Sequence, residues 1–221
     1  MARRSTRLST KAAPSTPIAT ASKSTPAARV TTKDPETITF PSPTDFNAWL
    51  LANGTTTPSG IWLKIAKKAS RIPSVSYDEA VDAALCHGWI DGQRKALDGD
   101  YFVQRFTPRR RNSLWSRRNV DKAAALAAEG RMHDTGRAEV DAARADGRWD
   151  RAYAGPATMR VPADFAAALQ ANREAGEAFE RLGRSARFPF LWRVATAKKE
   201  ETRRRRIDTF VAMLARGETL T

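Results

Sequence analysis

The sequence predicts an α+β domain, with a small antiparallel β-region in the N-terminal half packed with a predominantly helical C-terminal half. Three observations favour this class. Residues 61–66 and 101–106 alternate apolar and polar side chains, as half-buried strands do. From Ser113 onward, apolar residues recur at helical spacing instead. With 221 residues, 41% of them hydrophobic, the chain is long enough for one domain with a sizeable core.

Residues 1–33 differ from the rest in composition and are predicted to be a disordered basic tail. They hold seven Lys or Arg residues and twelve Ser or Thr residues, but no acidic or aromatic residue. Such a segment buries too little apolar surface to offset the entropy lost on ordering. Without the seven charges of the tail, the net charge of +14 falls to +7 for residues 34–221, which are predicted to form a single domain.

Three roles for the tail stay open. An Arg- and Ser-rich, acid-poor composition is typical of an organellar transit peptide. It also suits a basic arm that contacts nucleic acid or directs the protein to the nucleus. The third alternative is a solvated leader without a role. We expect the protein to lie in the cytoplasm. The alternative is an organelle or the nucleus, to which the tail would direct it.

A strand and a helix are predicted at the start of the domain. Residues 38–40 favour a short strand, and Pro43 lies in the first turn of a helix that ends at Asn53-Gly54. The alternation that begins at Ile61 then predicts the second strand.

The next predicted elements are a capped helix, two turns and a strand. Ser76 and Glu79 have the spacing of a capping box, which predicts a helix that ends at Gly88. The Asp91-Gly92 and Asp98-Gly99 pairs both predict turns. Residues 101–106 are expected to pair with an earlier strand.

The C-terminal half is predicted to be helical, with glycines between the helices. The expected helices cover residues 116–128, 136–146, 163–172, 174–182, 189–198 and 200–215.

Composition and motifs exclude several classes of site. One cysteine and two histidines exclude a disulfide framework, and they exclude zinc sites built from four cysteines or from two cysteines and two histidines. No run of about 18 apolar residues predicts a membrane span. No phosphate-binding loop, dinucleotide fingerprint, metalloprotease helix or nucleophile elbow is present. We therefore expect a soluble basic protein with no metal, no cofactor and no catalytic residue, and favour a binding protein over an enzyme.

A distinctive set of residues lies between Tyr77 and Asn119. It includes Gly88-Trp89-Ile90-Asp91-Gly92 and Thr107-Pro108-Arg109, followed by Trp115-Ser116. Near the C-terminus the same ordered set continues with Ala197-Lys198 and Thr202-Arg203. In this order the set resembles the YdeI/OmpD-associated family, also labelled bacteriocin-protection proteins, over about residues 38–217. The resemblance implies a small soluble binding protein linked to stress or toxin tolerance. It implies no reaction, cofactor or catalytic residue.

His87 and Asp91 support an enzymatic alternative, a small hydrolase or transferase with Arg94 at the same site. His87 is expected at a helix end, four residues before Asp91, so that a carboxylate would orient it as a general base. The competing interpretation is a histidine favoured by the helix C-terminus and an aspartate that stabilises a turn. Cys86 and His87 do not form a nucleophile–base pair, because the side chains of adjacent residues on a helix point about 100° apart.

Further side chains favour binding an anion or another ligand. Arginines suit phosphate or carboxylate groups. Trp89 and Trp115 suit stacking, although large aromatics in a helical core more often pack. The candidate ligand-binding set is His87, Trp89, Asp91, Arg94, Arg109, Trp115, Arg203 and Arg206.

The run Arg203–Arg206 is expected on the last helix. Four consecutive helical residues sweep about 300°, so at least one must face the core side and pair with a buried carboxylate. The candidate carboxylates are Glu79, Asp82 and Asp91. Convergence of Arg109 and Arg206 near Trp89 would form an anion-binding pocket.

A basic cluster supports a third function, nucleic-acid binding together with the tail. Residues 101–120 contain six arginines and no acidic residue, with Tyr101, Phe102, Phe106 and Trp115 interleaved. Arginines beside aromatics suit a phosphate backbone with stacked bases, but also an anionic ligand, the acidic face of a protein, or a solvated loop. The partner therefore stays open. The candidate nucleic-acid-binding residues are Arg105, Arg109, Arg110, Arg111, Arg117 and Arg118.

Overall fold

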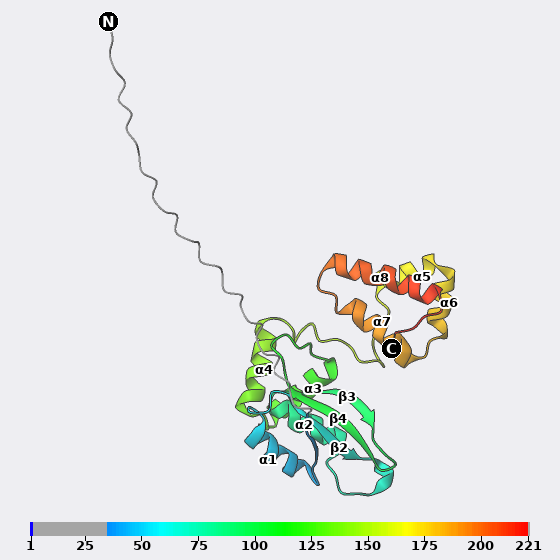
Figure 1. The fold of residues 1–221 in the computed structure, drawn as a ribbon. Coiled ribbons are helices and arrows are strands. Elements are labelled where there is room, and N and C mark those ends of the chain that lie inside the picture. Colours follow the sequence, from blue (N-terminus) through cyan, green and yellow to red (C-terminus); the bar gives the residue numbers. More distant parts are fainter. Residues whose placement is uncertain (2–34, 221) are drawn as a thin grey trace. The chain divides into compact units, whose positions relative to one another are not determined.

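A computed structural model describes Met1 and residues 35–220 of the chain, and every structural statement refers to these residues. The prediction of a disordered tail falls on residues outside them. Within the described part, eight α-helices and a four-stranded sheet confirm the α+β class (Figure 1).

The sheet has the strand order β1-β2-β4-β3. Its strands are β1 (Thr37–Thr39), β2 (Ile61–Ala66), β3 (Trp89–Ala96) and β4 (Tyr101–Pro108). The antiparallel pairing is confirmed for β2, β3 and β4, whereas β1 runs parallel to β2. The helix α1 (Pro43–Asn53) lies between β1 and β2 in the chain and returns it in the same direction, as a parallel pair requires.

Strand β3 was not expected, because its sequence carries a turn signal. Asp91-Gly92 lies inside β3, so the turn predicted there is wrong. The register with β4 shifts between Asp91 and Arg94, and such a bulge disrupts the two-residue alternation that marks a strand. The turn at Asp98 is confirmed, since its Oδ1 accepts hydrogen bonds from the backbone amides of Asp100 (2.9 Å) and Tyr101 (2.7 Å).

The helices of the N-terminal half lie close to their predicted positions. Helix α2 (Tyr77–Cys86) begins with the predicted box, in which the Glu79 amide donates to the Ser76 hydroxyl and the Ser76 amide donates to the Glu79 carboxylate. A short 3-10 helix, Lys68–Ser70, precedes it. Helices α3 (Arg117–Ala128) and α4 (Asp134–Ala145) lie within two residues of their predicted bounds.

Four helices form the C-terminal segment: α5 (Ala163–Ala171), α6 (Arg173–Arg181), α7 (Arg184–Ala195) and α8 (Glu200–Ala215). Three lie close to their predicted bounds, but α7 begins five residues before the expected 189. Pro189 lies inside α7, five residues after the helix begins.

Buried side chains form two hydrophobic clusters. In the first, Ile61, Leu63 and Ile65 of β2 pack with side chains of α1 and α2, which cover one face of the sheet (Figure 1). The second contains four phenylalanines of the C-terminal helices, whose rings meet edge to face: Phe165, Phe179, Phe190 and Phe210. The helix-rich half thus carries a core of its own.

Candidate functional site

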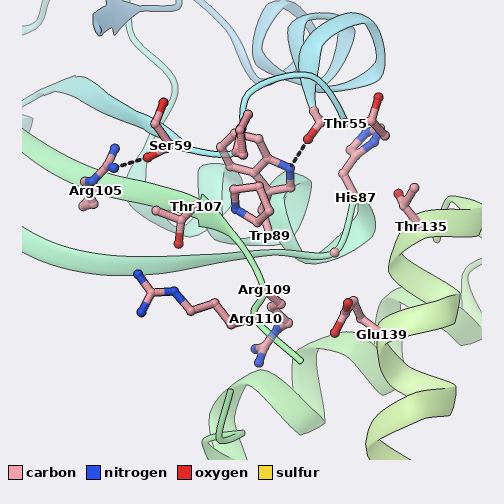
Figure 2. A pocket seen from close by; sticks show the side chains of 14 residues that line it. Thr55, Ser59, His87, Trp89, Arg105, Thr107, Arg109, Arg110, Thr135 and Glu139 are labelled. Atoms are coloured by element: carbon pink, nitrogen blue, oxygen red, sulfur yellow. Dashed lines mark hydrogen bonds between the residues drawn. The ribbon is translucent and has the colours of Figure 1, made fainter. Parts of the chain in front are cut away.

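A cavity of about 550 Å³ opens where four segments of the N-terminal half meet. These are the loop after α1, the turn between α2 and β3, the end of β4 and the first turns of α4. Figure 2 shows their side chains around the space. The lining residues are Gly54, Thr55, Pro58, Ser59, His87, Gly88, Trp89, Arg105, Thr107, Pro108, Arg109, Arg110, Thr135 and Glu139.

Arg109 is the most unusual lining residue, because it is charged and only 7% exposed. Its guanidinium lies over the ring of Trp115, 3.5 Å from the ring centroid, and Nη1 donates a long hydrogen bond of 3.4 Å to the Leu114 carbonyl. Nε and Nη2 are buried and have no hydrogen-bond partner among the described residues. Buried guanidinium groups are normally paired, so two free donors here mark a place for an acceptor.

Burial lowers the pKa of Arg109 from 12.5 to about 10. Glu139 and Asp91 act in the opposite direction through their negative charges, but neither forms an ion pair with Arg109 in the described structure. Since a pKa near 10 lies well above neutrality, Arg109 is charged at pH 7. The cavity wall therefore contains a desolvated positive charge without a contacting counterion.

Two more arginines make the lining positive. Arg105 donates a hydrogen bond from Nη2 to the Ser59 carbonyl, while its Nη1 is buried without a partner among the described residues (Figure 2). Arg110 is exposed at the end of β4, and Glu139 is the only acidic side chain in the lining. Hydroxyl groups from threonines and Ser59 complete a polar surface that suits an anionic group on a polar ligand.

His87 lies in the same wall, at the C-cap of α2. Its Nε2 lies 3.0 Å from Oδ1 of Asn47, and its ring stacks on His133 with a centroid distance of 4.0 Å. Burial, together with the charge of His133, lowers the pKa of His87 from 6.5 to about 4. His87 is therefore neutral at pH 7, and its role at that pH is to donate or accept hydrogen bonds.

The contact between α2 and α4 fixes this wall. The His133 amide donates to the Cys86 carbonyl at 3.0 Å, and Gly136 lies so close that an added Cβ would overlap the same oxygen. Gly88 has a φ of 75°, which only glycine adopts readily, and faces the Thr135 carbonyl. Cys86 itself is buried, and burial raises the pKa of its thiol.

The structure does not bring Asp91 and Arg94 to the cavity that His87 lines. Asp91 accepts a 2.7 Å hydrogen bond from the Tyr77 hydroxyl. Arg94 lies over the rings of Tyr77 and Phe102. Trp89 lines the cavity but is 1% exposed, and its Nε1 donates to the Gly54 carbonyl, so little of its ring is free to stack on a ligand.

The predicted partners of the last-helix arginines are wrong. Arg203 pairs in a two-pronged contact with Asp164 of α5, and Arg206 donates to the Arg193 carbonyl. Neither arginine lines the cavity. Of the three carboxylates predicted as partners, Asp82 pairs with Lys122, and Glu79 caps α2. The prediction failed because residues distant in sequence decide which carboxylate lies near a helix face.

The six arginines of the predicted basic cluster have different surroundings. Arg105 and Arg109 line the cavity as described, and Arg110 and Arg111 are exposed. Arg117 donates to the Asp150 carbonyl, whereas Arg118 forms an ion pair with Asp78. The arginines of the cluster therefore have different surroundings: some line the cavity, some are exposed in the loop after β4, and one forms an ion pair.

Sequence analysis missed several lining residues. Thr55, Ser59, Thr135 and Glu139 belong to no motif, and Asn47 reaches His87 from 40 residues away in the chain. Only tertiary contacts bring them together, so no local pattern signals them.

Comparison with known families divides the chain. Residues 158–217 match the family model described as "Bacteriocin-protection, YdeI or OmpD-Associated". The resemblance to this family is thus confirmed for the C-terminal segment. Residues 38–139 match a different model, described as "Domain of unknown function (DUF8412)". The motifs between Tyr77 and Asn119 therefore lie outside the segment that carries the match, whereas Ala197-Lys198 and Thr202-Arg203, on which the resemblance also rests, lie inside it.

The other two comparisons gave no match, either among curated proteins or among solved structures. Within the described residues, no helix has both the length and the apolar composition needed to cross a membrane. The same residues contain no group of three or more His, Cys, Asp or Glu side chains placed to hold a metal ion.

Proposed function

We propose that this protein binds a small organic anion in the cavity lined by Arg109. The observation that carries the proposal is the buried, charged guanidinium whose Nε and Nη2 have no partner among the described residues. A phosphate or carboxylate group that displaces the atoms covering Nε and Nη2 accepts from both donors and supplies the counterion. The cavity volume of about 550 Å³ lies within the range of small-molecule sites.

Calorimetric titration of the full chain with inorganic phosphate and with malonate tests this proposal and separates phosphate from carboxylate ligands. We expect one of the two to bind the wild type and neither to bind Arg109→Met. Arg111→Met is the matched control, because it removes the same charge from an exposed residue outside the cavity. Equal binding by wild type and Arg109→Met would reject the proposal.

We further propose that binding serves stress or toxin tolerance, as the description of the family matched by residues 158–217 suggests. The cavity lies entirely within residues 54–139, so it shares no residue with that segment. Survival of cells carrying wild type, Arg109→Met or Arg111→Met under bacteriocin exposure tests the link. Loss of protection by Arg109→Met alone would connect the cavity to tolerance, and equal protection would separate them.

For the compartment, we propose the cytoplasm, with an organelle or the nucleus as the alternative. The support for the alternative is the basic, acid-free composition of residues 1–33. Fluorescent fusions with and without these residues test it, because only a targeting tail changes the location when removed.

A further inference from the structure

The sheet has a second face, formed by the strand residues that alternate with core residues. In β2, Ile61, Leu63 and Ile65 are buried, whereas Trp62 and Lys64 are only partly buried. The register places Trp62 opposite Arg105 and Lys64 opposite Val103, which is also opposite Lys95. We call this the outer sheet face; its residues are Thr37, Thr39, Trp62, Lys64, Ala66, Lys95, Tyr101, Val103 and Arg105.

Two aromatic rings lie on this face outside the hydrophobic cores. Trp62 and Tyr101 are partly exposed, and neither belongs to either of the two clusters. Their rings are covered by cations instead of by apolar side chains. Lys64 Nζ lies 3.9 Å from the centre of the Tyr101 ring, and Lys95 Nζ lies 4.5 Å from that of Trp62.

The charge of the outer sheet face has one sign. Its strand positions hold three cations and no acidic residue. In the described structure, Lys64, Lys95 and Arg105 contact rings and, for Arg105, a backbone carbonyl, rather than carboxylates. Asp98 lies in the turn between β3 and β4, where its oxygen accepts hydrogen bonds from backbone amides. The charged strand positions of this face are thus all positive, and two partly exposed rings lie among them.

We propose that the outer sheet face binds single-stranded nucleic acid. Bases of a single strand would displace Lys64 and Lys95 from the faces of the two rings and stack there, while the lysine and arginine side chains neutralise the phosphates between the bases. A duplex keeps its base faces hidden, so it would use the cations but not the rings. An acidic protein would likewise gain little from Trp62 and Tyr101.

This surface is separable from the anion site. Trp62, Lys64, Lys95 and Tyr101 do not line the cavity, and only Arg105 takes part in both. Along β4, the outer-face residues lead from Tyr101 to Arg105 and on to Thr107 in the cavity wall. Each proposal can therefore be refuted without affecting the other, provided that Arg105 is not replaced in the variants tested.

Fluorescence anisotropy of a labelled single strand of about 12 nucleotides, titrated with the full chain over a salt series, tests the proposal. Every variant keeps residues 1–33, so any contribution of these basic residues is constant. We expect Trp62→Leu to weaken binding about tenfold while the salt dependence stays unchanged, because a ring and not a charge is lost. Lys95→Glu should weaken binding about tenfold and also reduce the slope of log affinity against log salt by about one.

Arg205→Glu is the matched control for Lys95→Glu, because it makes the same charge change on an exposed residue of α8. Wild-type binding by Trp62→Leu, or equal losses in Lys95→Glu and Arg205→Glu, would overturn the proposal in favour of nonspecific charge. Equal affinity for a duplex, or full competition by polyglutamate, would overturn it as well. If circular dichroism shows that Trp62→Leu does not fold, the comparison of Lys95→Glu with Arg205→Glu tests the proposal.

Discussion

Replacing Arg109 by methionine should make the protein more stable when no binding anion is present. The guanidinium is 7% exposed and unpaired at two nitrogens among the described residues, so the folded state bears the cost of keeping a desolvated charge. A pKa lowered from 12.5 to about 10 corresponds to about 3 kcal/mol, at about 1.4 kcal/mol per pKa unit. Methionine has a similar length and no charge, and it removes this cost.

Two losses oppose the gain. The cation contact with the Trp115 ring contributes about 1 kcal/mol, and the 3.4 Å hydrogen bond to the Leu114 carbonyl contributes less than a good one. We therefore expect a net gain of about 1–2 kcal/mol, consistent with the stabilisation seen when buried ionic groups are replaced by apolar ones. For a chain of this size the gain raises Tm by about 2–8 °C.

Differential scanning calorimetry at low ionic strength, in a buffer without phosphate or carboxylate, measures this difference. Urea unfolding of the same samples gives the free energy directly, and an unchanged slope with urea shows that the two native states expose similar surface. A loss of stability of more than about 1 kcal/mol in the variant would refute the reasoning. It would mean that the folded protein already satisfies the charge of Arg109.

Two further predictions concern the frame around the cavity, and a third concerns the C-terminal helices. Lowering the pH from 7 to 5 should reduce the free energy of unfolding by about 2 kcal/mol through His87. The pKa of His87 is about 4 in the folded state and 6.5 in the unfolded state, so the unfolded state takes up the proton first. Urea unfolding of His87→Gln should therefore show a smaller loss between the two pH values. Gly136→Ala should cost about 3 kcal/mol, because the added methyl overlaps a backbone oxygen, whereas Gly99→Ala, with nothing within 4 Å, should be neutral by the same assay. Asp164→Asn should cost about 1 kcal/mol in thermal unfolding, since its ion pair with Arg203 is partly exposed; an unchanged Tm would show that the pair contributes nothing.

Local signals in the sequence were sufficient for most elements. The Ser76–Glu79 box and the alternation of β2 rest on neighbouring residues, and both are confirmed. Strand β3 was missed because a bulge at Asp91–Arg94 carries the same residues as a turn. The start of α7 was predicted five residues late, and its N-cap, Gly183, makes no side-chain hydrogen bond that would mark it.

The candidate site was predictable only in part. His87, Trp89 and Arg109 were candidates from sequence, and all three line the cavity. That Arg109 is buried without a partner among the described residues could not be predicted, because burial depends on Trp115 and on helices that follow it in the chain. Glu139 lies on α4 with no motif around it, so its approach to the cavity comes from tertiary packing alone.

The single cysteine of the chain offers a consequence of a different kind. Cys86 is buried beneath the contact between α2 and α4, where Gly136 meets its carbonyl, and its thiol has a raised pKa. Because Cys86 is 3% exposed, a thiol reagent can modify it only when this part of α2 opens locally, so the labelling rate reports the free energy of that opening. Because the sequence contains no second cysteine, labelling of the unsubstituted protein measures local opening at Cys86 alone, next to the cavity wall.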